Sequence, residues 1–171
     1  MKQRTQRTKY SMSPLALSLL IILAFASITF SNHAQLSFAQ NNTSFVNSFE
    51  KLVKNANNLS QSYHNETEKF AKGQIDNKTM IAITDNYEQK YQNLIKEAKE
   101  LQPPKEFQNA TDLYTKSLEL ELQSNNHFRD YLSTNNSTEN NLSSKLLSDS
   151  FNYELEAFKK LKASGSFTIL P

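Results

Sequence analysis

Cysteine is missing from all 171 residues, and glycine occurs only twice. Without a thiol, the chain cannot form a disulfide framework, a thiolate metal site, a cysteine nucleophile or a lipid-modified cysteine. Two glycines are too few for the glycine-rich loop that cradles a phosphate group. A nucleophile elbow, a zinc-binding helix and a calcium loop are also missing from the sequence. We therefore expect no enzyme activity, no catalytic residue and no cofactor.

A long apolar run occurs only near the N-terminus. Four basic residues, Lys2, Arg4, Arg7 and Lys9, precede an almost wholly apolar run over residues 15–30, and Ser37-Phe38-Ala39 then offers small residues for cleavage. This is the order of a secretory signal. This run of sixteen residues is shorter than the roughly 20 predominantly apolar residues that usually span a bilayer. The sequence predicts a signal over residues 1–39, cleaved after Ala39; the alternative is an uncleaved membrane anchor through residues 15–30.

The charge balance changes once this segment is set aside. Four of the 19 basic residues lie in it and none of the 17 acidic residues does, so 15 basic residues face 17 acidic ones in the remainder. The remaining basic residues are scattered lysines, with Arg129 as the single arginine. This pattern excludes nucleic acid as an expected partner. We expect an unknown protein or envelope component as the partner, outside the cytoplasmic membrane.

Apolar residues recur at steps of three and four in four later stretches, which is the period of an amphipathic helix. Gly73, the Pro103-Pro104 pair, the polar stretch over residues 134–140 and Gly165 mark the predicted helix ends. The helices are expected over residues 44–72, 78–101, 105–133 and 139–163, with Thr43 or Ser44 capping the first one. The apolar stripe of the fourth helix is predicted from Leu142, Leu146, Leu147, Phe151, Leu155, Phe158 and Leu161.

Four amphipathic helices of similar length with short connections can bury their stripes only against one another. The sequence therefore predicts one all-α domain over residues 40–171, an antiparallel up-down four-helix bundle. Leu118, Leu120 and Leu122 alternate with glutamates in a strand-like pattern, but they lie inside a long helix-period segment. The apolar residues of the tail, residues 166–171, are expected to fold over one end of the bundle.

Asparagine triplets of the form Asn-x-Ser/Thr are unusually frequent. There are nine, against about three expected from 18 asparagines and 23 serines and threonines after residue 39. In an exported protein these triplets are acceptors for N-linked glycans. The alternatives are that the cell lacks the machinery or that folded helices hide the acceptors. The candidate residues are Asn41, Asn42, Asn58, Asn65, Asn77, Asn109, Asn135, Asn136 and Asn141.

Two histidines, His64 and His127, fall at similar heights of the predicted first and third helices and suggest a metal site. Bundle metal sites usually pair each histidine with a glutamate three residues earlier, and Gln61 and Ser124 occupy those positions here. We therefore expect two solvent-exposed rim histidines and no metal site. The glutamates stand beside lysines at helical spacing, as Glu66 does near Lys69, and are expected on solvated faces.

Five tyrosines lie on or near the predicted stripes: Tyr63, Tyr87, Tyr91, Tyr114 and Tyr153. They could line an internal pocket for an apolar or aromatic ligand. Tyrosines of a bundle more often sit at the edge of the core with the hydroxyl group in water. Packing is therefore the favoured interpretation, and a tyrosine-lined ligand pocket is the alternative.

The basic head, the Ser37-Phe38-Ala39-Gln40 junction, the helical body rich in Asn, Ser and Lys and the many glycosylation triplets resemble exported helical proteins of ammonia-oxidising-type archaea. The resemblance implies a secreted or cell-surface location and an N-glycan, and it implies no activity. Taken together, the sequence predicts a non-enzymatic envelope or secreted bundle that acts as an interaction or spacer module. A small-ligand-binding bundle and a metal-binding bundle are the alternatives.

Overall fold

The structure is a computed structural model that describes residues 39–163, with side chains described from Thr43 onward. It contains four helices and no strand in this range: α2 (Ala39–Ala71), α3 (Asn77–Glu100), α4 (Lys105–Thr134) and α5 (Ser137–Ala163). The all-α prediction is confirmed, and the helix ends lie within five residues of those expected. Residues 1–38 of the predicted signal, the C-terminal tail and Gly165 lie outside the described residues. No helix among residues 39–163 is long and apolar enough to cross a membrane.

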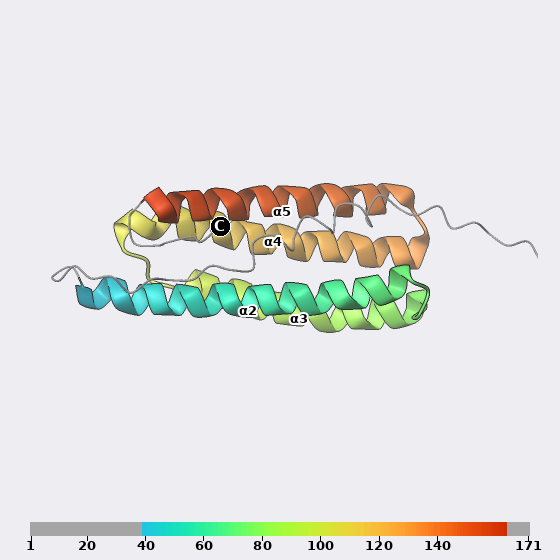
Figure 1. Cartoon of the computed structure of the whole chain (residues 1–171). Helices are drawn as coiled ribbons and strands as arrows, with labels where there is room; N and C mark the ends of the chain where they lie inside the picture. The colour runs from blue at the N-terminus through green and yellow to red at the C-terminus, as the bar shows by residue number, and fades with distance from the viewer. Residues whose placement is uncertain (1–38, 164–171) are drawn as a thin grey trace, which may run out of the picture.

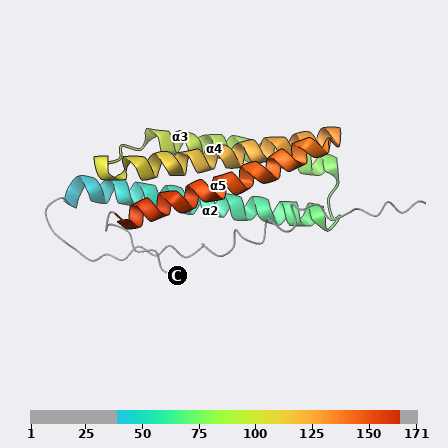
Figure 2. The same cartoon turned by 90° about the horizontal axis from the view of Figure 1, so that it is seen from above.

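The four helices run alternately up and down, because each connection is too short to carry the chain back along the bundle. Figure 1 shows α4 and α5 side by side in one layer and α2 and α3 in the other. In the view from above, α5 lies along α4 near their connection and turns towards α2 at its C-terminal end (Figure 2).

The helix ends follow local chemistry. Gly73, with φ of 70°, ends α2 in a Schellman motif, in which its N–H donates to the Phe70 carbonyl group and the Gln74 N–H donates to the Lys69 carbonyl group. Asp76 caps α3 by accepting a hydrogen bond from the Thr79 N–H at 2.8 Å. The predicted cap of α2 at Thr43 or Ser44 is wrong, because the helix already begins at Ala39.

Apolar side chains gather in two clusters at opposite ends of the bundle. The larger cluster joins the first halves of α2 and α4 to the second half of α3 and the C-terminal part of α5, and includes Phe49, Leu94 and Phe107. The smaller cluster lies near the α2–α3 and α4–α5 connections and contains the buried residues Tyr63, Met80, Phe128 and Leu132. Polar residues occupy the region between the two clusters, which is described below.

Small residues line the face that α4 and α5 share. They recur every seven residues on both helices and are all buried: Ala110, Ser117 and Ser124 on α4, and Ser143, Ser150 and Ala157 on α5. The Ser124 hydroxyl group donates to the Ser143 carbonyl group, and the Ser150 hydroxyl group donates to the Ser117 carbonyl group, both at 2.8 Å. Small side chains at a helix contact allow the two backbones to approach closely. We call these six residues the small-residue seam.

The buried face of α5 differs from the predicted stripe. Phe158 and Leu161 are buried as expected, but Leu142 is 37% exposed and the other predicted residues, Leu146, Leu147, Phe151 and Leu155, are only partly buried. The physical reason is the seam, because the close approach to α4 places the serines of α5 inside and the larger side chains beside the contact. Apolar periodicity alone could not identify this face.

Candidate functional site

Polar side chains from three helices meet between the two apolar clusters. Tyr91 of α3 donates a hydrogen bond to the Glu121 carboxylate of α4 at 2.6 Å, and Ser60 of α2 donates to the same oxygen, Oε1, at 2.8 Å. The hydroxyl oxygens of Ser60 and Tyr91 are 3.1 Å apart. Tyr91 is fully buried, and the carboxylate of the half-buried Glu121 therefore points inward.

Helix periodicity places a second carboxyl group, that of Glu154 on α5, in this layer. On α4, Glu121 lies seven residues from both Tyr114 and Phe128, which are buried, and on α5, Glu154 lies seven residues before the buried Leu161. Seven residues are close to two helical turns, so these side chains share one face of their helix. Both glutamates therefore stand at positions that a typical bundle fills with apolar residues.

The interior raises the pKa of both carboxyl groups. Burial and, to a smaller extent, the nearby charge of Glu121 together raise the pKa of Glu154 to about 7. Burial also raises the pKa of Glu121, while the hydrogen bonds from Tyr91 and Ser60 oppose this rise by stabilising the charged form. The layer can thus hold a proton on Glu154 near neutral pH next to a hydrogen-bonded Glu121 carboxylate.

Two buried tyrosines act as neutral hydrogen-bond donors in this region, Tyr91 to the Glu121 carboxylate and Tyr63 to the Thr84 hydroxyl group. Thr84 donates to the Met80 carbonyl group, so the Tyr63 hydroxyl group, 2.9 Å from the Thr84 hydroxyl oxygen, is the donor to Thr84. Burial raises the pKa values of Tyr63, Tyr91 and Tyr114 above the usual range of a phenol. We call Ser60, Tyr63, Thr84, Tyr91, Tyr114, Glu121 and Glu154 the polar layer.

The five tyrosines that could have lined one pocket differ in burial. Tyr63, Tyr91 and Tyr114 are buried in the bundle. Tyr87 is half-buried, with its ring centroid 5.1 Å from that of Tyr63, and Tyr153 is 37% exposed on α5. This arrangement favours the interpretation that the buried tyrosines pack the interior.

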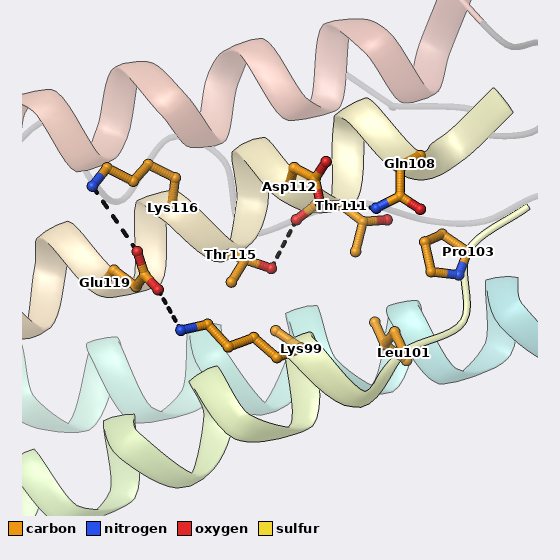
Figure 3. A pocket seen from close by; sticks show the side chains of 10 residues that line it. Lys99, Leu101, Pro103, Gln108, Thr111, Asp112, Thr115, Lys116 and Glu119 are labelled. Atoms are coloured by element: carbon orange, nitrogen blue, oxygen red, sulfur yellow. Dashed lines mark hydrogen bonds and ion pairs between the residues drawn. The ribbon is translucent and has the colours of Figure 1, made fainter. Parts of the chain in front are cut away.

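A hollow of about 330 Å³ lies elsewhere, between the end of α3 and the first half of α4. Figure 3 shows it next to the α3–α4 connection, with the Glu119 carboxylate between Lys99 and Lys116. The Lys99 ammonium group is 2.6 Å from Glu119 and that of Lys116 is 3.9 Å away. None of the five tyrosines lines this hollow.

The two histidines have different surroundings. His64 has a side chain that is only 13% exposed, with Nε2 at 3.3 Å from a Glu68 carboxylate oxygen and a buried Nδ1 that has no hydrogen-bond partner in the described structure. The prediction of a solvent-exposed rim position is therefore wrong for His64. His127 is 32% exposed, and its Nδ1 lies 2.6 Å from a carboxylate oxygen of Glu139, across the α4–α5 connection.

His127, Asp130 and Glu139 form a compact group of ionisable side chains. One ligand atom from each lies within 4.8 Å of the others, which is a spacing that could surround one divalent cation. Asp130 also lies 3.7 Å from the Arg129 guanidinium group, which pairs with Asp85 of α3 as well. The structure therefore places carboxylates next to His127. From the sequence, His127 had been considered together with His64 instead.

The seven glycosylation candidates with described side chains are all exposed: Asn58, Asn65, Asn77, Asn109, Asn135, Asn136 and Asn141. Asn41 and Asn42 fall in the first turns of α2, and their side chains lie outside the described residues. The buried asparagines, Asn125 and Asn140, do not belong to such triplets.

Sequence reasoning missed both interior glutamates. The general rule holds for Glu66, which pairs with Lys69 at 2.8 Å on the surface. The rule fails for Glu121 and Glu154. Each lies seven residues from buried neighbours on its own helix, so its side chain faces the interior although charged residues stand nearby in the sequence. That spacing is the signal in the sequence that could have identified them.

Comparisons with protein-family models, with characterised proteins and with solved structures gave no significant match to this chain.

Proposed function

We propose that this chain is an exported, non-enzymatic helical bundle that acts in the cell envelope or outside the cell as an interaction or spacer module and carries N-linked glycans. The observation that carries the proposal is the placement of the glycosylation triplets. Each of the seven described acceptor asparagines is exposed, while the two buried asparagines belong to no triplet. An excess of acceptor triplets at the surface is expected of a chain that meets glycan-transfer machinery.

The shape and the interior of the bundle support a structural role. The longest described helix after α2 is α4, whose 30 residues span about 45 Å at a rise of 1.5 Å per residue. Apolar clusters at both ends and the hydrogen-bonded layer between them hold the four helices in one register. Such a bundle would keep two attached elements at a fixed separation, which is what a spacer does.

The proposal is tested by intact-mass and N-terminal analysis of the native protein, purified separately from the growth medium and from membranes. We expect a chain that begins at Gln40, with added mass in multiples of a glycan. A chain that keeps residues 1–39 in the membrane fraction would favour the anchored form of the same module. An unmodified, full-length chain recovered only from the cytoplasm would contradict the proposal.

A second candidate, a divalent-cation-binding bundle, is favoured by the grouping of His127, Asp130 and Glu139. The three side chains supply one imidazole nitrogen and two carboxylate oxygens, a donor set that suits zinc or manganese. Titration with zinc, followed by calorimetry, tests this candidate, with His127→Ala as the variant and His64→Ala as the matched control. Binding near one zinc per chain that only His127→Ala abolishes is expected; equal binding by both variants would exclude this site.

A further inference from the structure

The seven described glycosylation triplets differ in how accessible their hydroxyl residue is in the folded bundle. Enzymes that modify Asn-x-Ser/Thr recognise both the asparagine and the hydroxyl residue two positions later, and this motif is characteristic of surface loops. In a helix, residues two apart point about 200° from each other. A helical triplet with an exposed asparagine therefore directs its hydroxyl residue towards the opposite side of the helix.

Four triplets lie inside helices and follow this rule. Ser143, the partner of Asn141, is 1% exposed in the small-residue seam, and Thr111, the partner of Asn109, is 3% exposed and donates to the Phe107 carbonyl group. An enzyme cannot reach either hydroxyl group without separating or unwinding helices.

The other two helical triplets, those of Asn58 and Asn65, also have engaged hydroxyl groups. Ser60, two residues after Asn58, donates to the Glu121 carboxylate in the polar layer. Thr67, two residues after Asn65, is half-buried and donates to the His64 carbonyl group. The folded bundle thus buries the hydroxyl residue of two helical triplets and engages the half-buried hydroxyl residue of the other two in hydrogen bonds.

Three triplets stand at helix starts, with both motif residues exposed: Asn77 with Thr79, Asn135 with Ser137, and Asn136 with Thr138. The Asn77 amide nitrogen donates to the Leu132 carbonyl group, and the Asn136 side-chain oxygen accepts from the Thr138 N–H, so both carboxamides have structural roles. Asn135 differs from them. Its backbone is left-handed, with φ of 56°, and within the described residues no hydrogen bond engages its carboxamide or the Ser137 hydroxyl group.

We propose that Asn135 is the N-glycan site of the folded protein and that the triplets of Asn58, Asn65, Asn109 and Asn141 are inaccessible once the helices have formed. The inference rests on the proposed function, because it requires an exported chain that meets an activated sugar phosphate and its transferase. The Asn135 amide nitrogen attacks the anomeric carbon and forms the C–N bond. The bond from that carbon to the phosphate oxygen breaks, the phosphate leaves with the electron pair, and the amide nitrogen loses one proton.

The test is site-by-site glycopeptide mass spectrometry of the full chain, expressed in its own organism and recovered from the envelope and the medium. The matched variants are Ser137→Ala, which removes the Asn135 triplet and leaves that of Asn136 intact, and Thr67→Ala, which removes the Asn65 triplet. Both substitutions leave the acceptor asparagines unchanged, so the left-handed turn at Asn135 is not disturbed. Circular dichroism shows whether each variant retains its helical fold.

We expect a glycan on Asn135, loss of one glycan mass in Ser137→Ala and no change in Thr67→Ala. Glycans on helical triplets at an occupancy equal to that of Asn135 would overturn the inference while supporting the proposed function. A processed, exported chain without a glycan at any triplet would overturn both the inference and the glycan-bearing part of the proposed function. An unprocessed cytoplasmic chain would overturn the proposed function and, with it, the inference.

Discussion

At the scale of single residues, the polar layer places ionisable groups where a bundle usually has leucine. Glu154 is the clearest example, because burial raises its pKa from 4.5 to about 7. A group whose pKa is higher in the folded state binds more protons when the protein is folded. Its stabilising contribution is complete below pH 4.5 and is lost as the pH rises through 7. A shift of this size corresponds to about 3 kcal/mol between the two limits.

Replacing Glu154 with glutamine should remove this pH dependence, because the amide stays neutral throughout. At pH 8 we expect Glu154→Gln to increase the free energy of unfolding by about 1–3 kcal/mol, and at pH 4.5 we expect little change. Urea unfolding at both pH values measures the effect, with the exposed Glu156 changed to Gln as the matched control. A destabilised Glu154→Gln at pH 8 would show that the charged form contributes to folding.

The hydroxyl group of Tyr91 stabilises the inward-facing carboxylate of Glu121. Tyr91→Phe removes one of the two hydrogen bonds to Oε1, and we expect it to lower the free energy of unfolding by about 1–3 kcal/mol. Tyr87→Phe is the matched control, because the Tyr87 hydroxyl group makes no hydrogen bond within residues 43–163. Equal effects of the two substitutions in chemical denaturation would argue against a specific role for the Tyr91 hydroxyl group.

At the scale of the elements, α5 is held chiefly by its packing along α4. The small-residue seam sets this contact, since its hydrogen bonds fix one antiparallel register. Ser124 contacts Ser143, and Ser117, seven residues earlier on α4, contacts Ser150, seven residues later on α5. A larger side chain in the seam would have to push the helices apart. Such overpacking typically costs about 1–3 kcal/mol or more.

Ser150→Leu tests this packing directly. We expect it to lower the free energy of unfolding by about 2–3 kcal/mol, because the new side chain cannot fit against Ser117. Ser150→Ala should cost only about 1 kcal/mol, for the lost hydrogen bond. The control is Ser148→Leu on the exposed side of α5. If Ser150→Leu proved as stable as the control in thermal or urea unfolding, the close approach of α4 and α5 would be refuted.

At the scale of the whole molecule, the two ends of the bundle bury unequal amounts of apolar surface. The cluster that includes Phe49 and Phe107 contains fifteen buried residues, whereas the cluster that includes Met80 and Phe128 contains four. Segments with less buried apolar surface open locally at a lower free energy. The end with the α2–α3 and α4–α5 connections should therefore open first. This end also carries Asn135.

Native-state hydrogen exchange provides the measurement. We expect the amide protons of residues 80–84 and 128–132 to show smaller opening free energies than those of residues 94–98 and 110–118. The contrast should persist at pH values where exchange is limited by the opening equilibrium. Uniform protection along all four helices would instead show that the polar layer couples both ends into one cooperative unit.

The sequence by itself determined the all-α class, the four helices and most of their ends. Its information is local: helical periodicity requires only neighbours along the chain, and Gly73 and the Pro103-Pro104 pair interrupt helices by their own backbone preferences. Large apolar or aromatic residues at helical spacing, such as Phe49 and Tyr91, are buried without the help of any particular neighbour.

Only the tertiary structure decided which polar residues face inward. Glu121 is interior because Tyr91 and Ser60 of other helices supply hydrogen bonds to it, and Ser150 is buried because Ser117 of α4 is small enough to admit it. For the same reason, the exposed Asn141 could be recognised from the sequence, but the burial of its partner, Ser143, could not. The seven-residue spacing marks an interior-facing position in the sequence, but the burial of a polar group there depends on what the neighbouring helix offers, and that information is absent from the local sequence.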